Sequence, residues 1–172
     1  GRLWEILLPG TNLFLTEREN SEEKMRYVVV GAEKEGRPIL LHTQKTNDVA
    51  QFLIEEWLVP GLEGSQVIQK EVKSGKSRLD FLLRQGEQKI FLEVKSCTLF
   101  AGKVAMFPDA FTERGRRHLL KLAELSDEER RGKVLFLVHS PEVDFFLPDY
   151  HTDLAFSQTM LSLRDKIEFI PL

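Results

Sequence analysis

A carboxylate followed by a Glu-x-Lys sequence is the part of this chain whose residue types could do chemistry. Asp80 lies in one apolar run, Arg78–Leu83, and Glu93 and Lys95 lie in the next, Lys89–Ser96. If the runs form a strand hairpin, Asp80 can lie beside Glu93. Glu93 and Lys95 then share one face, roughly 6.5 to 7 Å apart. Two carboxylates suit Mg²⁺ or Mn²⁺, and an ammonium can orient water or stabilise phosphate charge. The pattern is typical of a metal-dependent phosphodiesterase.

The alternative is that Asp80 is an edge residue and that Glu93 and Lys95 form an exposed ion pair. An acid followed at this distance by Glu-x-Lys is a weak pattern by itself. The apolar context favours a site, because Asp80 lies between Leu79 and Phe81, and Glu93 follows an apolar triplet. Isolated charges seldom occupy such positions without partners.

Composition predicts a soluble globular protein and argues against a membrane-spanning or disulfide-bonded one. Of the 172 residues, 42% are apolar and 30% are charged, enough for one domain or one domain with a small module. No apolar run reaches the length of a membrane span, and no basic-then-apolar leader is recognisable. The single cysteine, Cys97, excludes an internal disulfide and predicts a cytoplasmic protein. We interpret it as a small buried hydrophobic residue rather than a nucleophile.

The charge distribution is uneven along the chain. The net charge is −3, which taken whole argues against nucleic-acid binding, yet residues 66–117 carry eleven basic and six acidic residues. That local excess of positive charge is typical of a surface that binds a polyanion. Chance clustering of solvated side chains is an equally good explanation at this stage.

Periodicity and turn residues predict small β-structure first and a mixed sheet afterwards. The expected N-terminal strands are Arg2–Leu8, Asn12–Thr16, Tyr27–Ala32 and Pro38–His42, with a solvated loop over residues 17–24. Asn47 is the expected cap of a helix that ends near Trp57, with Val49, Phe52, Leu53 and Trp57 toward the core. Three strands should follow, at Val67–Lys73, Arg78–Leu83 and Lys89–Ser96.

The sequence after residue 96 predicts helices that alternate with strands. Residues 99–111 carry no element signal and are expected to form a long loop. Thr112 should cap a helix to about Leu125, followed by a strand at Lys133–His139 buried on both faces. A last helix, Asp153–Arg164, and a strand, Ile167–Ile170, complete the pattern. We therefore predict an α/β (α+β) mixed sheet flanked by helices.

The helix that begins after Thr112 presents a second feature with possible chemistry. Arg114, Arg117, His118 and Lys121 have the spacing of one helix face. A helix N-terminus also contributes partial positive charge and N–H groups that suit phosphate. The alternative is an ordinary solvated helix face, although basic residues at a helix start are mildly unfavourable with the dipole.

Four ordered motifs resemble those of the sugar fermentation stimulation protein A (SfsA) family. They are Arg78–Phe81, Glu93–Ser96, Phe107–Ala110, and Thr112–Gly115 with His118. The resemblance implies an N-terminal OB-like β-barrel, here residues 1–45 and expected to lack its first strands. It implies a PD-(D/E)xK nuclease-like domain over residues 46–172. It also implies a prokaryotic cytoplasmic protein that binds DNA without sequence preference and regulates sugar (maltose) metabolism.

Two functional hypotheses follow from the residues and the resemblance together. In the first, the chain binds DNA without chemistry, and the expected phosphate contacts come from Lys76, Arg78, Arg114, Arg117 and His118. In the second, it is a nuclease in which Asp80, Glu93 and the Val94 carbonyl hold Mg²⁺ or Mn²⁺ and Lys95 positions the attacking water. We predict DNA binding and leave catalysis open. A sugar- or nucleotide-sensing function has no supporting motif.

Overall fold

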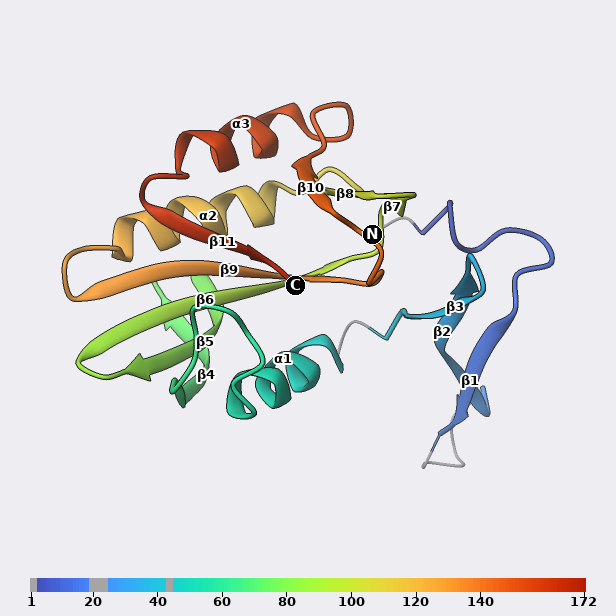
Figure 1. The fold of residues 1–172 in the computed structure, drawn as a ribbon, viewed down its shortest axis with the longest axis horizontal. Coiled ribbons are helices and arrows are strands. Elements are labelled where there is room, and N and C mark those ends of the chain that lie inside the picture. Colours follow the sequence, from blue (N-terminus) through green and yellow to red (C-terminus); the bar gives the residue numbers. More distant parts are fainter. Residues whose placement is uncertain (1–2, 19–24, 43–44) are drawn as a thin grey trace.

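The computed structural model describes residues 3–18, 25–42 and 45–172 and shows three sheets and three helices (Figure 1). The elements, in chain order, are β1 (Leu13–Glu17), β2 (Tyr27–Lys34), β3 (Arg37–Leu40), α1 (Thr46–Glu55), β4 (Gln66–Ser74), β5 (Ser77–Gln85), β6 (Gln88–Cys97), β7 (Phe100–Ala101), β8 (Val104–Phe107), α2 (Glu113–Leu125), β9 (Arg130–Val138), β10 (Phe145–Pro148), α3 (Leu154–Ser162) and β11 (Ile167–Pro171).

The central sheet has the strand order β11-β9-β6-β5-β4. Its β4, β5 and β6 are antiparallel neighbours, and its β6, β9 and β11 are parallel. The predicted mixed sheet is thus confirmed, with β9 buried on both faces as its continuous apolar run indicated. Because β6 lies in the middle, the Glu93–Lys95 motif occupies the most enclosed strand.

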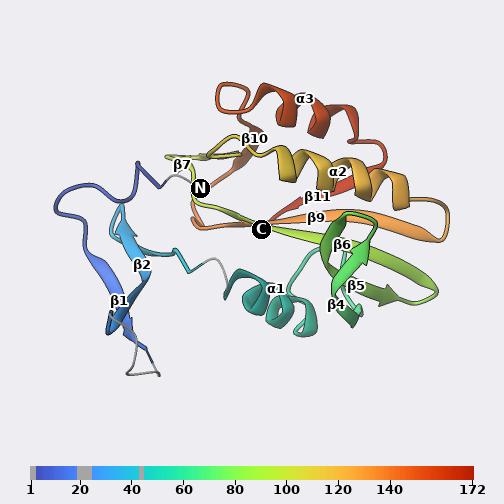
Figure 2. The same ribbon diagram turned by 180° about the vertical axis from the view of Figure 1, so that it is seen from behind.

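Helices cover both faces of this sheet. Figures 1 and 2 show α2 and α3 on one face and α1 on the other. Alternation along β6 assigns its residues to these two layers. Ile90, Leu92 and Val94 belong to the core cluster under α1, whereas Cys97 belongs to the cluster under α2 and α3. Glu93 therefore faces the layer that contains α2.

The segment expected to be a structureless loop forms a small sheet instead. The hairpin strands β7 and β8 lie within residues 99–111, and β8 pairs in parallel with β10. Its partner strand comes about forty residues later, so no local pattern could reveal the pairing. Phe107, at the end of β8, packs edge-on against Phe136 and Phe156 and anchors this sheet to the core.

The N-terminal part is an open three-stranded antiparallel sheet, β1-β2-β3, and not a closed barrel in the described residues. The expected first strand is wrong: residues 4–7 form turns, with Leu7 N–H donating to the Leu3 carbonyl at 2.8 Å. Arg2 and residues 19–24 of the expected loop lie outside the described residues. Ala32 and Ile39 pack into the same cluster as Phe100, and the division at residue 45 stays a prediction.

Helix α1 buries only part of the predicted face, because Leu53 packs against the core whereas Val49 and the two aromatic residues are exposed. Thr46, Ala50 and Ile54 are buried, whereas Phe52 is 58% exposed and Trp57 is 63% exposed. The small Ala50 side chain allows close packing on the sheet, so the aromatic residues point outward. The expected cap is also wrong, because the helix begins after Lys45 and Asn47 lies inside its first turn.

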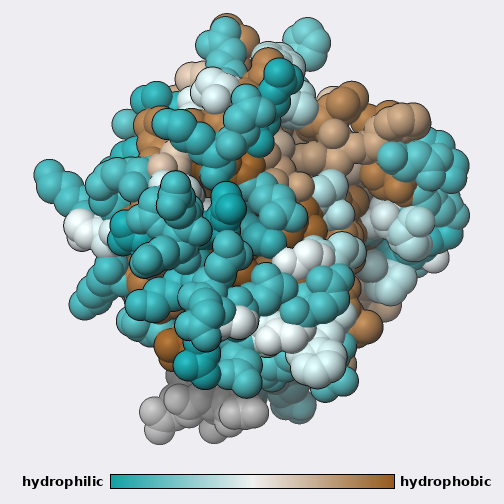
Figure 3. All heavy atoms as spheres, turned by 60° about the vertical axis from the view of Figure 1, so that its left-hand side comes forward, coloured by the Kyte–Doolittle hydropathy of each residue, from teal (hydrophilic) through white to brown (hydrophobic). Residues whose placement is uncertain are grey.

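The described helices include none that is long and apolar enough to cross a membrane. Figure 3 brings forward the end of the molecule where α2 connects to β9, and most of that face is hydrophilic.

The orientation of α1 on the sheet can be tested by replacing one buried and one exposed residue of the same helix. Ile54→Ala should lower the free energy of unfolding by about 2–5 kcal/mol, because Ile54 is fully buried. Phe52→Ala should change it by about 0.5 kcal/mol or less, as exposed side chains usually do. Chemical denaturation measures both, and a larger loss for Phe52→Ala would contradict the observed packing.

Candidate metal and phosphate site

A cleft of about 480 Å³ lies where β5 and β6 stop pairing with each other, beside the start of α2. It gathers residues from all four motifs that distinguished the sequence, together with the start of α1. The side chains around it include Asn47, Asp80, Glu93, Lys95, Ser96, Asp109, Phe111, Arg114 and His118. The predicted catalytic residues Asp80, Glu93 and Lys95 are therefore in one place.

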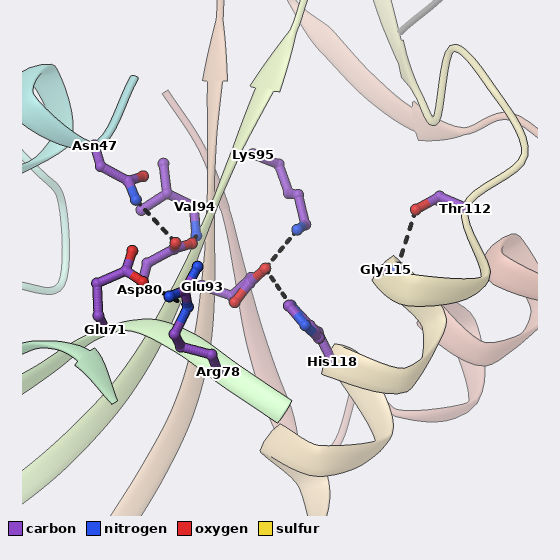
Figure 4. Close-up of polar contacts among 10 residues, drawn as sticks. All are labelled: Asn47, Glu71, Arg78, Asp80, Glu93, Val94, Lys95, Thr112, Gly115 and His118. Atoms are coloured by element: carbon purple, nitrogen blue, oxygen red, sulfur yellow. Dashed lines mark hydrogen bonds and ion pairs between the residues drawn. The ribbon is translucent and has the colours of Figure 1, made fainter. Parts of the chain in front are cut away.

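Asp80 occupies the point at which β5 and β6 separate. The last paired residues of these two strands are Phe81 and Leu92. Asp80 and Glu93 are their immediate neighbours, just beyond the end of the pairing. Asp80 Oδ2 accepts the Val94 N–H at 2.8 Å, and Oδ1 accepts Asn47 Nδ2 at 2.9 Å (Figure 4). The carboxylate thus satisfies a backbone donor that the neighbouring strand no longer reaches.

The charge on Asp80 is unfavourable in this position. Burial raises the pKa of its carboxyl group above the usual range, and the nearby Glu93 charge raises it further. The hydrogen bonds from Val94 and Asn47 oppose this shift without cancelling it. Asp80 and Glu93 are therefore close enough to repel each other.

Glu93 is only 2% exposed and holds two partners on one oxygen. Its Oε1 lies 2.5 Å from Lys95 Nζ and 2.5 Å from His118 Nδ1. Burial alone would raise the pKa of Glu93, but the His118 and Lys95 contacts outweigh it and lower the pKa. Its second oxygen, Oε2, is buried and has no hydrogen-bond partner in the described part of the chain.

Lys95 confirms the expected strand geometry. It projects from the same face of β6 as Glu93, and its side chain is 19% exposed where it lines the cleft. The alternative of an exposed Glu93–Lys95 pair is wrong, because the carboxylate is buried and the ammonium is mostly enclosed.

His118 and Asn47 have roles that the sequence analysis did not find. His118 was expected on an exposed basic face, but it is 4% exposed and binds Glu93 across the cleft. Asn47 was expected to cap a helix, but its amide binds Asp80. Both contacts join residues far apart in sequence, so spacing along one helix could not predict them.

The other predicted DNA-binding residues are distributed around the cleft. Arg114 lines it and Arg117 is exposed further along α2, whereas Lys76 lies exposed in the turn between β4 and β5. Arg78 is also exposed, but its Nε lies 2.6 Å from Glu71 Oε2, which offsets its charge. Of these four cations, Arg114 is the one that lines the cleft.

The start of α2 is fixed at the rim of the cleft. Thr112 caps the helix as predicted, because its hydroxyl accepts the Gly115 N–H at 3.1 Å. Its own N–H donates to Asp153 Oδ2, the cap of α3, at 2.8 Å. The positive end of the helix dipole therefore lies beside Arg114 at a defined position.

Cys97 behaves as a buried hydrophobic residue, which confirms that interpretation. It is 1% exposed, and burial raises the pKa of its thiol to about 12. A thiol with such a pKa is not a nucleophile at neutral pH.

The acidic residues fit a small ligand set for a hard cation. The described residues contain no group of three or more His, Cys, Asp and Glu side chains arranged to hold a metal. The oxygens that converge are those of Asp80 and Glu93. Because the N–H and C=O of a strand residue point to the same edge, the Val94 carbonyl is directed toward the Asp80 side.

The family model described as the sugar fermentation stimulation protein RE domain (SfsA) matches residues 44–172. The sugar fermentation stimulation protein homolog of Methanothermobacter thermautotrophicus is 35% identical over 160 residues, covering 93% of this chain and 67% of the relative. The Clostridium tetani homolog is 36% identical over 163 residues, covering 94% and 71%.

A solved structure of Pyrococcus furiosus SfsA in complex with Ca²⁺ is similar throughout the chain. The TM-score is 0.90 at 32% sequence identity, and the match covers 100% of this chain and 74% of that one. The predicted resemblance is confirmed by the family model and the relatives together, and this chain belongs to the SfsA family.

Proposed function

We propose that this chain binds DNA in the cleft between β5, β6 and α2, with a divalent cation held by Asp80 and Glu93. The observation that carries the proposal is the buried, unpartnered Oε2 of Glu93, close to a second carboxylate. A buried anionic oxygen without a partner is costly. A cation between the two carboxylates would remove that cost and the repulsion that raises the pKa of Asp80.

The chemistry of the donors favours a hard cation. Asp80, Glu93 and the Val94 carbonyl offer oxygen only, which suits Mg²⁺ or Mn²⁺. The Pyrococcus furiosus relative was solved with Ca²⁺, another hard divalent cation. When bound, such an ion supplies positive charge to phosphate oxygens and lowers the pKa of water.

Phosphate contacts would come from the cations near the cleft. Arg114 lines it, Arg117 and Lys76 are exposed nearby, and Arg78 can contribute if it leaves Glu71. Backbone contacts of this kind carry no sequence information, so the proposed binding is non-sequence-specific. His118 acts differently: it holds Glu93 in place from within the core. A regulatory role in sugar (maltose) metabolism stays a prediction.

Hydrolysis of the DNA phosphodiester is the second candidate function. Lys95 favours hydrolysis, because its ammonium lies beside Glu93 and lines the cleft, where its side chain is only 19% exposed to solvent. It can donate a hydrogen bond to a phosphate oxygen or hold a water, and it would stabilise charge that develops only during reaction.

The metal proposal predicts a shift in thermal stability. Mg²⁺ or Mn²⁺ should raise the Tm of the wild type by mass action on the folded state, and Asp80→Asn should abolish that rise. In EDTA, Asp80→Asn should be at least as stable as wild type at neutral pH. The raised pKa means that ionisation of Asp80 above its unfolded pKa reduces stability. Equal metal-induced shifts in both proteins would contradict the shared site.

The DNA proposal predicts a localised, salt-dependent affinity. Arg114→Ala with Arg117→Ala should lower affinity similarly for unrelated sequences and flatten the dependence of log K on log salt by about 2. The matched control is Arg164→Ala with Lys166→Ala, which removes the same charge at a hollow away from the cleft. Fluorescence anisotropy across a salt series measures both, and identical losses would indicate only a global charge effect.

The nuclease candidate predicts a specific effect of Lys95. Lys95→Ala should retain metal-induced stabilisation and most DNA affinity, because an ammonium is not a ligand and one phosphate contact among several is lost. Cleavage in Mn²⁺ should fall by about 10²-fold or more. Lys103→Ala, which removes an exposed lysine outside the cleft, should cleave normally. Absence of cleavage by the wild type would leave DNA binding alone as the function.

A further inference from the structure

A second hollow of about 370 Å³ adjoins the cleft and shares part of its wall. Asp109, Ala110 and Phe111 line both spaces, so the hollow and the cleft are neighbours. The second hollow is distinguished by three ring side chains from separate segments: Trp4, Phe111 and His151. Trp4 is 71% exposed and Phe111 is 68% exposed, and His151 is also exposed.

Single exposed aromatic residues are ordinary, but three around one hollow are a feature to explain. Two of the three rings lie on supported backbone. Asp149 Oδ1 accepts the His151 N–H at 3.0 Å, and Asp149 N–H in turn donates to the Phe107 carbonyl at 2.8 Å. Thr112, next to Phe111, is tied to Asp153. Phe111 and His151 are therefore presented in the open by a supported backbone, which limits the entropy lost on binding.

We infer that this hollow is a stacking site for unpaired nucleobases, and that the nucleic acid taken by the cleft is single-stranded. The inference rests on the proposed function and specifies its substrate class. A strand whose phosphates lie near Arg114 would place a neighbouring base over the shared residue Phe111. Bases of a duplex are stacked on one another and offer no free face, whereas unpaired bases stack on aromatic side chains.

The charges in the hollow also favour a base over a phosphate. Glu5 lines the hollow and not the cleft, and its charge would disfavour a phosphate placed there. The phosphates are thus directed to the Arg114 side and the bases to the ring side.

The test measures anisotropy of a labelled oligonucleotide in Ca²⁺, as an unpaired strand, as the same strand with abasic sites, and as a duplex of equal length. Wild type should bind the unpaired strand more tightly than the duplex. Phe111→Ala should weaken binding to the unpaired strand by about tenfold, which is the effect of losing one stacked base. The same change should have little effect on the abasic strand or the duplex.

Two variants control for loss of fold and for loss of any exposed ring. Phe111→Trp should retain the affinity, because it keeps a stacking face. Phe145→Ala removes a phenylalanine that is 62% exposed and lines neither space, and it should bind like wild type. In a Trp57→Phe background Trp4 is the only tryptophan, and its fluorescence should be quenched by the unpaired strand.

The outcomes separate this inference from the proposed function. Equal or tighter binding of the duplex, or a Phe111→Ala loss that is the same for all three ligands, overturns the stacking site but leaves DNA binding intact. No change in any ligand with Phe111→Ala overturns it in the same way. Failure of the wild type to bind any of the three overturns the proposed function and this inference together.

Discussion

The buried carboxylate of Glu93 is the constraint around which the site is organised. A charge at 2% exposure requires compensation, and the structure supplies it from two elements. Lys95 comes from the same strand and His118 from α2, and both contact one oxygen. The position of α2 on the sheet is therefore linked to the charge of Glu93, and the other oxygen has no hydrogen-bond partner among the described residues.

The second carboxylate is placed by a change in backbone pairing. Where β5 and β6 separate, Asp80 takes the role of the missing strand partner by accepting the Val94 N–H. The same hydrogen bond draws the carboxylate toward Glu93, although burial and repulsion raise the pKa of Asp80. The charge on Asp80 is the unfavourable one, whereas His118 and Lys95 stabilise the charge on Glu93, and shifted pKa values of this kind cluster at functional sites.

The sequence was informative where local periodicity and the wider fold agree. Apolar runs predicted β9 and the β4–β6 meander, and Thr112 was correctly identified as a cap because its signal is local. The motif around Glu93 and Lys95 predicted one strand face for the same reason. The role proposed for the Val94 carbonyl, as a ligand of the cation, depended on the family resemblance. A backbone oxygen can be a ligand whatever the side chain is, so the valine itself gave no indication of it.

The errors share a physical cause, which is that tertiary contacts decided between local alternatives. Phe52 looked like a core residue by size, but close packing of α1 selected Ala50 and Ile54. His118 looked like part of a basic surface, but a buried acid twenty-five positions earlier in the chain took it inward. The parallel pairing of β8 was missed because its partner, β10, is distant in sequence.

The most direct test of a divalent cation at Asp80 and Glu93 is a crystal soaked in Mn²⁺ and measured for anomalous scattering. The account predicts one peak bounded by Glu93 Oε2 and the Asp80 carboxylate, at the roughly 2.0–2.6 Å typical of oxygen ligands to hard cations. The peak should be absent from crystals of Asp80→Asn. A peak elsewhere in the cleft, with none between these two side chains, would contradict it.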